Sequence, residues 1–333
     1  MATIYDVSVL AGVSLATVSR VMNKNAKVSE KTCKKVLDAM AELGYRPNAV
    51  AQSLASNRSN SVGILVSELK GQFYGAMLSG IEAELREAGK HVIITAGHAN
   101  EADEIDGIEF LIDRSCDALI LHVEAVSDEY LVELSKGAVP FVLINRNIKE
   151  LADNCVSLDN EKGGYVATKT LIDKGHKDIA YIAGPMWKSD ALGRLAGHKR
   201  ALAEHNLNFS DELFFEGNYR QSGGVAGMNH LIESGKSFSA VVCANDETAS
   251  GAMTVCRENN LKIPEEVSIV GFDNIIFAGH LYPKLTTLDY PIIEMGHMAA
   301  KLTLQNSYQA NNLKIKHLFD PELIVRDSVS KIN

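Results

Sequence analysis

The sequence predicts an N-terminal, all-α helix-turn-helix headpiece followed by an α/β body of two doubly wound parallel-sheet lobes. Three observations support this fold class. The chain has 333 residues, 46% of them hydrophobic and 23% charged, which suits two or three globular domains and excludes a mainly disordered chain. Residues 1–60 carry eight Lys or Arg and four Asp or Glu, a net charge of +4, whereas the remainder carries 25 and 38, a net charge of −13. The hydrophobic pattern changes at the same place, from helical periodicity to alternating strands and helices.

The first two helices are predicted from the residues at their ends. Thr3 and Asp6 have the spacing of a capping box, so a short helix begins after Thr3. Gly12 suits the left-handed turn that ends such a helix. Ser14 is a good N-cap for a second helix over residues 15–22. Two short helices joined by such a turn form a helix-turn-helix.

A third helix is predicted over residues 30–43, between Ser29 and Gly44. Four of its apolar side chains are expected to close a small core with Val18 and Val21 of the second helix. These four are Val36, Leu37, Met40 and Leu43.

The exposed face of the second helix is predicted to read DNA. Leu15, Ala16 and Arg20 lie opposite Val18 and Val21 on a helix, and they can reach base edges in the major groove. The fork of Arg20 can bond both acceptors of a guanine, and Leu15 and Ala16 can contact a thymine methyl group. Phosphate contacts are expected from Tyr5, Ser14, Thr17, Ser19 and Asn23. The alternative is a helical cap that packs on the body, which the local charge of +4 disfavours.

The rest of the chain alternates β-rich runs with amphipathic helical stretches. The strands are predicted at 62–67, 91–96, 118–123, 141–145, 155–159, 178–183, 213–216, 240–244 and 267–272. The helices are predicted at 75–88, 101–113, 163–174, 192–204, 224–233 and 247–258. Such alternation builds parallel βαβ sheets. Two sheets of five or six strands fit ordinary sheet sizes better than one large sheet.

Polar side chains follow three of the predicted strands directly. The pairs are Asn145-Arg146, Asn245-Asp246 and Asp273-Asn274. Because ligands of open α/β sheets bind at the carboxyl ends of the strands, these pairs are expected to converge on a cleft between the lobes. Carboxylates, amides and Arg can each bond the vicinal hydroxyls of a sugar. The alternative for any one pair is a turn or a helix cap.

Several function classes are disfavoured by the sequence. No hydrolase, metalloprotease, dinucleotide or P-loop motif is present, so no enzyme is expected. The five cysteines are dispersed and are expected to be free, with no metal and no cofactor. No apolar run is long enough to span a membrane and no secretory signal precedes the first helix, so a cytoplasmic protein is expected. A free sugar-binding protein of periplasmic type remains an alternative, but it gives no reason for residues 1–60.

The N-terminal motifs closely resemble the lactose/galactose repressor family of bacterial transcription regulators. They read Thr3-Ile4-Tyr5-Asp6-Val7, Ala11-Gly12-Val13-Ser14, Thr17-Val18-Ser19-Arg20-Val21 and Gly44-Tyr45-Arg46-Pro47-Asn48. The resemblance continues through Arg194-Leu195-Ala196-Gly197, Ala244-Asn245-Asp246 and Gly271-Phe272-Asp273. It covers essentially the whole chain and implies a periplasmic-binding-protein-like body. Within the family the resemblance points to the galactose repressor and isorepressor.

The resemblance divides the chain into three parts. Residues 1–46 form the headpiece, 47–60 a hinge helix and linker, and 61–333 a body for ligand binding and dimerisation. The N-lobe is expected at about 61–160 and 290–318, and the C-lobe at about 161–289 and 319–333. The family's minor-groove hinge contacts map to Asn48, Gln52 and Leu54, with Leu54 as the wedge between bases.

The resemblance also implies the ligand and the assembly. By match to the family, ligand contacts are expected from Asn145, Arg194, Asn245 and Asp273, and Tyr219, Phe73, Tyr74 and Arg146 complete the predicted set. The implied effector is a monosaccharide such as galactose that acts as inducer, and the alternative is a corepressor of purine type or a protein partner. A homodimer on double-stranded operator DNA is expected. Since no leucine heptad ends the chain, a tetramer is not expected.

Overall fold

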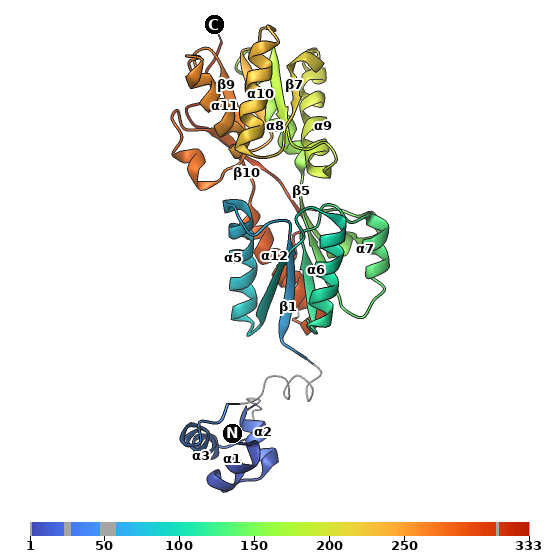
Figure 1. Ribbon diagram of the computed structural model, residues 1–333, viewed down its shortest axis with the longest axis vertical. Helices are drawn as coiled ribbons and strands as arrows, with labels where there is room; N and C mark the ends of the chain where they lie inside the picture. The colour runs from blue at the N-terminus through green and yellow to red at the C-terminus, as the bar shows by residue number, and fades with distance from the viewer. Residues whose placement is uncertain (1, 23–27, 47–57, 311–312, 333) are drawn as a thin grey trace. The chain divides into compact units, whose positions relative to one another are not determined.

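The computed structural model describes residues 2–22, 28–46, 58–310 and 313–332, and the chain divides into two compact units, 1–60 and 61–333. The headpiece holds α1 (Ile4–Ala11), α2 (Leu15–Met22) and α3 (Glu30–Glu42) (Figure 1). Helices α1 and α2 meet at 105°, which is typical of a helix-turn-helix.

The caps predicted for the headpiece are present. The Thr3 backbone N–H donates to Asp6 Oδ2 at 2.8 Å, and the Asp6 N–H donates to Thr3 Oγ1 at 3.3 Å. The Thr3 N–H and the Thr3 hydroxyl both donate to Asp6 Oδ2 and hold the pKa of Asp6 below its usual value. Gly12 ends α1 with φ +63°, a conformation that glycine adopts without strain. Residues 3–14 therefore fix the turn that aims α2.

The core of the headpiece differs from the prediction at one position. Val7, Val18 and Val36 are fully buried, but Leu37 is 55% exposed. Ala39, which is 4% exposed, takes its place. Residues 36 and 39 are three apart and share one face of α3, whereas residue 37 is turned by about 100° from that face. The predicted burial of Leu37 is therefore wrong.

The N-lobe is built on a six-stranded parallel sheet in the order β11-β5-β4-β3-β1-β2. Its strands are β1 (Ser61–Val66), β2 (His91–Ala96), β3 (Ala118–Leu121), β4 (Phe141–Ile144), β5 (Cys155–Leu158) and β11 (Leu318–Phe319). Its helices are α5 (Gln72–Glu87), α6 (Glu101–Asp113), α7 (Asp128–Leu134) and α12 (Ile292–Tyr308), with a 3₁₀ turn at Lys149–Asn154.

The C-lobe repeats this plan in the order β12-β10-β9-β8-β6-β7, and β12 alone among these strands runs antiparallel to its neighbour. Its strands are β6 (Ile179–Ala183), β7 (Phe214–Glu216), β8 (Ala240–Cys243), β9 (Ser268–Asp273), β10 (Thr286–Asp289) and β12 (Glu322–Ile324). Its helices are α8 (Asn160–Ile172), α9 (Ser189–Glu204), α10 (Gln221–Glu233) and α11 (Asp246–Glu258). Short 3₁₀ turns lie at Asp211–Leu213 and Ile276–Gly279.

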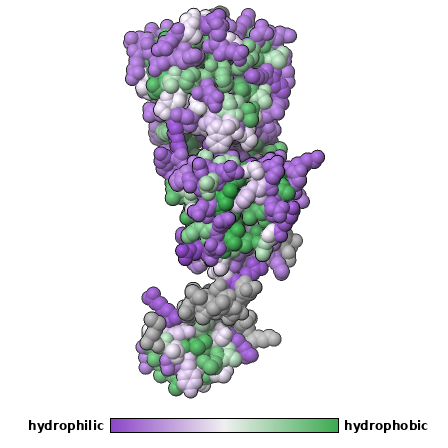
Figure 2. Space-filling view, turned by 45° about the vertical axis from the view of Figure 1, so that its right-hand side comes forward, coloured by the Kyte–Doolittle hydropathy of each residue, from purple (hydrophilic) through white to green (hydrophobic). Residues whose placement is uncertain are grey.

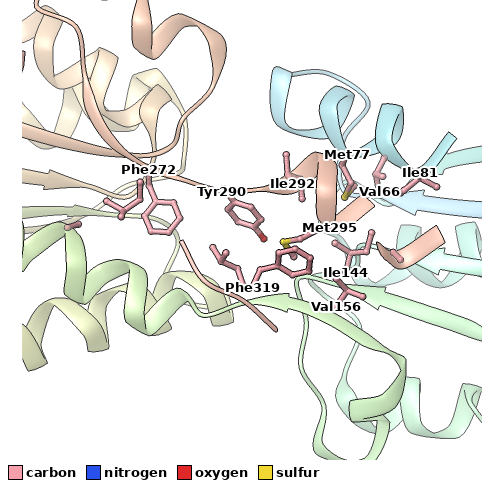
Figure 3. Close-up of a cluster of buried hydrophobic side chains, with 14 of the residues drawn as sticks. Val66, Met77, Ile81, Ile144, Val156, Phe272, Tyr290, Ile292, Met295 and Phe319 are labelled. Carbon is pink, nitrogen blue, oxygen red and sulfur yellow. The ribbon is translucent and has the colours of Figure 1, made fainter. Parts of the chain in front are cut away.

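Three segments cross between the lobes: β5 to α8, β10 to α12 and β11 to β12. A buried apolar cluster follows the crossings (Figure 3). Phe272 belongs to the C-lobe sheet, Tyr290 and Ile292 lie on a crossing segment, and Met77 and Ile81 lie on α5 of the N-lobe. The two lobes are therefore joined by a continuous apolar core. On the face of the lobes that Figure 2 shows, the surface is mostly polar, with an apolar area on the N-lobe.

All nine predicted strands are present, and the predicted fold class is that of the structure. Three short strands, β10 to β12, and helices α7 and α12 were not predicted. In the described ranges no single helix is long and apolar enough to cross a membrane, although the bent pair of α1 and α2 meets that length and composition together.

Candidate functional site

The headpiece presents the predicted DNA-reading side chains on α2. Leu15 is 44% exposed, and Ala16 and Arg20 are also exposed, because Val18 anchors the opposite face with no exposed surface. The DNA contacts themselves stay predictions.

The predicted phosphate-contact residues lie around the start of α2. Tyr5 and Ser14 are exposed, and Thr17 and Ser19 are half-buried. Ser14 Oγ accepts the Thr17 N–H at 3.2 Å and pairs with Thr17 Oγ1 at 2.9 Å, so it also caps the helix. Asn23, Asn48, Gln52 and Leu54 lie outside the described residues.

The body has a cavity between the carboxyl ends of its two sheets, as expected for open α/β sheets. Seven of the eight predicted ligand residues line it. Asn145 follows β4, and Phe73 and Tyr74 come from the first turn of α5. From the C-lobe come Arg194 on α9, Tyr219 after β7, Asn245 after β8 and Asp273 at the end of β9.

Arg194 organises the C-lobe wall and is only 3% exposed. Its Nε donates to Asn160 Oδ1 at 2.9 Å, and its Nη1 donates to the Ala244 carbonyl at 2.6 Å. The guanidinium carbon lies 3.7 Å from the centroid of the Phe272 ring, a cation–π contact. Nη1 also lies 3.8 Å from Asp273 Oδ1. The side chain is thus held rigidly before any ligand arrives.

Burial dominates the electrostatics of the cavity. It raises the pKa of Asp273 well above its usual value, although the Arg194 charge opposes the shift. Burial also lowers the pKa of His122, so that imidazole is neutral at physiological pH. His122 Nδ1 pairs with Ser67 Oγ at 3.2 Å. The wall therefore offers hydrogen-bonding groups with little unpaired charge.

Four of the cavity residues hold left-handed backbone conformations that cost energy in residues other than glycine. Ala99 has φ +52°, Asn145 has φ +60°, Tyr219 has φ +61° and Asp273 has φ +102°. Neighbouring groups restrain two of them: the Asn145 N–H donates to the Val156 carbonyl at 2.9 Å, and Asn245 Nδ2 donates to the Tyr219 carbonyl at 3.0 Å. Strain that clusters at one cavity marks it as a functional site.

The same cavity collects buried polar atoms that have no hydrogen-bond partner. Eight such side-chain atoms occur in the described part of the chain, and five belong to residues that line this cavity: Glu68 Oε2, His122 Nε2, Asn145 Oδ1, Tyr219 Oη and Tyr290 Oη. Buried polar groups are normally paired, so a cluster of exceptions indicates the place of a polar ligand.

Aromatic rings also line the cavity. The Phe73 ring lies 5.0 Å from Tyr290 and 5.4 Å from Tyr74, both edge to face. The Tyr74 ring lies 5.5 Å from His122. An apolar wall with a few convergent polar groups is the usual form of a small-molecule site.

Arg146 is placed apart from the other predicted ligand residues. Its Nε and Nη2 donate to Asp128 Oδ1 at 3.0 and 2.6 Å, and its side chain lines a neighbouring hollow instead. Arg146 lies two residues beyond the end of β4, after Asn145 with its left-handed backbone, and Asn145 itself lines both the cavity and this hollow.

Two ion pairs join the lobes across the cleft, and the sequence analysis did not find them. Lys188 Nζ lies 2.6 Å from Glu124 Oε2, and both side chains are at most 15% exposed. Arg220 pairs with Glu68. These pairs join strand ends of one lobe to loops of the other, which a sequence pattern cannot align.

His122, Asp190 and Tyr290 are further cavity residues that were not predicted. A signal existed for His122, because it interrupts the apolar run 118–123 at the end of a strand. Among the residues described, no group of three or more His, Cys, Asp or Glu could hold a metal ion, and all five cysteines are free.

His198 lies one turn beyond Arg194 on α9 and is 1% exposed. The Thr168 hydroxyl donates to the Gly164 carbonyl, so His198 Nδ1–H donates to Thr168 Oγ1 at 2.8 Å. His198 Nε2 is buried without a partner, so its protonation would bury an unpaired charge. Burial lowers the pKa of His198 to about 3.

We expect the stability of the body to decrease below about pH 6.5 because of His198. The unfolded chain binds this proton near its ordinary pKa of about 6.5, whereas the folded chain binds it only near 3. Stability is therefore full above that ordinary pKa and is lost towards acid by about 1.4 kcal/mol per pH unit. Urea titrations between pH 6.5 and 5 should show a shallower loss for His198→Leu than for wild type, with His230→Leu on an exposed face as control. Equal slopes for wild type and His198→Leu would contradict the prediction.

Known proteins match the chain over its whole length. Residues 3–48 match the family described as bacterial regulatory proteins, lacI family, and residues 168–329 match the periplasmic binding protein-like domain. The chain is 41% identical over 330 residues to the HTH-type transcriptional regulator GalR of Salmonella typhimurium, covering 99% of this chain and 96% of that protein. It is 34% identical over 334 residues to the HTH-type transcriptional repressor PurR of Vibrio campbellii, covering 100% of both. The structure of the lac repressor dimer bound to operator and the anti-inducer ONPF aligns with a TM-score of 0.88 at 28% identity, covering 99% of each chain.

These findings confirm the resemblance and the predicted fold class. The two relatives are named as transcription regulators, not as enzymes. The headpiece match, the full-length identity to GalR and the structural agreement with the lac repressor all lead to one conclusion. The chain belongs to the lacI family of bacterial regulatory proteins and is a DNA-binding transcription regulator.

Proposed function

We propose that this chain is a homodimeric repressor whose affinity for a double-stranded operator is lowered by a neutral monosaccharide, such as galactose, bound in the cleft. The observation that carries the proposal is the cluster of buried polar atoms without a hydrogen-bond partner beside an aromatic wall. A pyranose offers hydroxyl groups on its rim and C–H groups on its faces, and it complements both kinds of surface.

The charge of the cavity supports an uncharged effector. Four cationic side chains line it, Lys70, Lys188, Arg194 and Arg220, against five carboxyl groups, those of Glu68, Glu124, Asp190, Glu247 and Asp273. Arg194 already has Asn160 and Ala244 as partners. An anionic ligand would find no free excess of positive charge, whereas a polyhydroxylated one would find donors and acceptors.

The headpiece supports the operator as partner. Its +4 charge favours phosphate binding, whereas the −13 of the rest of the chain repels it. Affinity then depends on two correctly spaced headpieces, which a homodimer supplies. Such a repressor acts on chromosomal DNA, so we place it in the cytoplasm. The headpiece also argues against a free sugar-binding protein.

The proposed mechanism has two states. Sugar bonds to Arg194, Asn245 and Asp273 of the C-lobe and to Asn145 of the N-lobe, so it binds best when the lobes take one particular relative orientation. The N-lobes of a dimer then no longer hold the hinges and headpieces at operator spacing. A ligand shifts such an equilibrium only by its differential affinity, and operator must therefore weaken sugar binding by the same factor.

The proposal is tested by titrating the purified full-length chain onto operator DNA with galactose, other neutral monosaccharides and purine bases. We expect a neutral monosaccharide to reduce operator affinity, with galactose the strongest. If purines raised the affinity and no sugar lowered it, the corepressor alternative suggested by the PurR relative would replace the proposal. If no compound changed it, control by a cleft ligand would be refuted.

A further inference from the structure

One fully buried carboxylate of the N-lobe lies outside the effector cavity and has no role so far. Glu104 belongs to the first turn of α6 and has no exposed surface. Taking a carboxylate out of water is costly unless its oxygens are hydrogen-bonded. Here three consecutive backbone N–H groups donate to it, that of Glu124 to Oε1 at 2.8 Å and those of Ala125 and Val126 to Oε2 at 2.9 Å. The backbone therefore forms a cradle around one anion.

The neighbouring chain leaves room for this side chain. Gly97 directly follows β2, and its N–H donates to the Val66 carbonyl at 2.9 Å. A Cβ on Gly97 would lie 2.5 Å from Glu104 Cγ, so a larger residue would push the carboxylate aside. The N-terminus of α6 also favours a negative charge in its first turn. The local structure is thus built to hold a carboxylate at this place.

The segment that Glu104 holds is residues 122–126, which connect β3 to the start of α7. The His122 N–H donates to the Leu65 carbonyl at 2.8 Å and fixes the beginning of the segment. The next hydrogen bonds along it are the three to Glu104. Two side chains of this segment, those of His122 and Glu124, line the effector cavity. Their directions therefore depend on a residue that does not itself line the cavity.

Glu124 extends this dependence to the C-lobe. Its carboxylate lies 2.6 Å from Lys188 Nζ, and the two side chains are 12% and 15% exposed. Lys188 directly precedes α9, the helix that carries Arg194. An ion pair so far removed from water depends on exact geometry, because a small movement of one partner leaves two poorly solvated charges. The position of segment 122–126 thus determines whether the pair between the lobes can form.

We propose that Glu104 is a positioning residue of the effector site, which holds segment 122–126 so that Glu124 pairs with Lys188 and His122 faces the sugar. The inference rests on the proposed function, because the site that it serves is that of the sugar. Loss of the Glu104 carboxylate leaves three N–H groups without their acceptor, and the segment relaxes towards water to satisfy them. Sugar binding then weakens although every residue that lines the cavity is unchanged.

The test is calorimetric titration of the full-length protein and its Glu104→Gln variant with galactose and the other neutral monosaccharides of the operator experiment. Glutamine keeps one acceptor oxygen, but its amide group would turn N–H donors towards the backbone N–H groups. We expect the sugar to bind about tenfold more weakly or worse, while operator affinity without sugar stays within about threefold of wild type. Glu109→Gln, on an exposed part of the same helix, should change neither affinity.

Two further measurements separate positioning from a general loss of stability. Hydrogen exchange at the amides of residues 124–126 should be about tenfold faster or more in Glu104→Gln, with exchange in the C-lobe sheet unchanged. In a Glu124→Ala background, Glu104→Gln should weaken sugar binding by less than about threefold, because the side chain that it positions is gone. Equal losses in the two backgrounds, or faster exchange throughout the body, would refute the positioning role.

The outcomes also separate this inference from the proposed function. If folded Glu104→Gln bound sugar as wild type does, the inference would be refuted and the proposed function would stand. If Glu104→Gln did not fold, Gly97→Ala would take its place, because it keeps the carboxylate but displaces it, and it should weaken sugar binding in the same way. If the wild type bound no neutral monosaccharide, the proposed function and the inference would both fail.

Discussion

Operator binding by an Arg194→Lys variant should respond to the sugar only at much higher sugar concentration, although operator binding without sugar is retained. Lysine keeps the charge, but it cannot bond Asn160 and Ala244 while it also covers the Phe272 ring. Loss of a charged hydrogen bond costs about 1.5–3 kcal/mol, so we expect sugar affinity to fall roughly tenfold to a hundredfold. The headpiece is untouched.

The matched control is Arg200→Lys, the same change further along α9, where the side chain is 44% exposed and pairs with Glu161. Operator titrations with and without sugar measure the effect, and thermal unfolding verifies that both variants are folded. A normal sugar response in folded Arg194→Lys would remove Arg194 from the site. If folded Arg194→Lys did not bind operator in the absence of sugar, Arg194 would be needed for DNA binding itself and not only for the response to sugar.

The fold was predicted mainly from the pattern of strands, because buried parallel strands appear in a sequence as short apolar runs. Four helices begin three residues before their predicted starts: α5, α8, α9 and α10. Three of these predictions began at a glycine, Gly75, Gly163 or Gly224, since glycine weakens a helical pattern. Two of these glycines serve packing: a Cβ on Gly224 would lie 1.9 Å from the Thr248 carbonyl oxygen, and a Cβ on Gly163 would lie 2.5 Å from Phe272 Cε2. Close contact between α10 and α11 thus requires the glycine that weakens the local signal near the start of α10.

The crossing segments escaped prediction for a different reason. Strands β11 and β12 have two and three residues, too few for a periodic signal. They exist because β5 and β10 accept them as edge neighbours. Their place in the two sheets is a tertiary property of the lobes.

The candidate site was predictable where topology alone places a residue. The ends of parallel strands carry Asn145, Asn245 and Asp273. Their position in the sheets therefore places them at the cleft, independently of their side-chain conformations. Arg146 shows where this prediction from topology fails, because it directly follows Asn145 in the chain but lines only the neighbouring hollow. The pair Glu124–Lys188 spans 64 residues and two lobes, and only the relative placement of the lobes brings the two side chains together.

Arg20→Ala should remove most of the preference for operator over random DNA. A bidentate contact between Arg and guanine discriminates by about 1–3 kcal/mol. Since a dimer makes this contact twice, we expect a loss of roughly 2–6 kcal/mol in discrimination, or about thirtyfold to twenty-thousandfold. Leu15 and Ala16, on the same exposed face of α2, should retain a weak preference.

Arg20→Lys separates base reading from charge. It keeps the positive charge, so affinity for random DNA and its salt dependence should match wild type, while operator affinity falls almost as far as in Arg20→Ala. Binding to operator and to random duplexes at several salt concentrations measures both the sequence preference and the contribution of the positive charge. If Arg20→Lys kept full operator preference, Arg20 would act on phosphates through its charge. Base reading would then fall to Leu15 and Ala16, and substitutions there should show the large loss of discrimination instead.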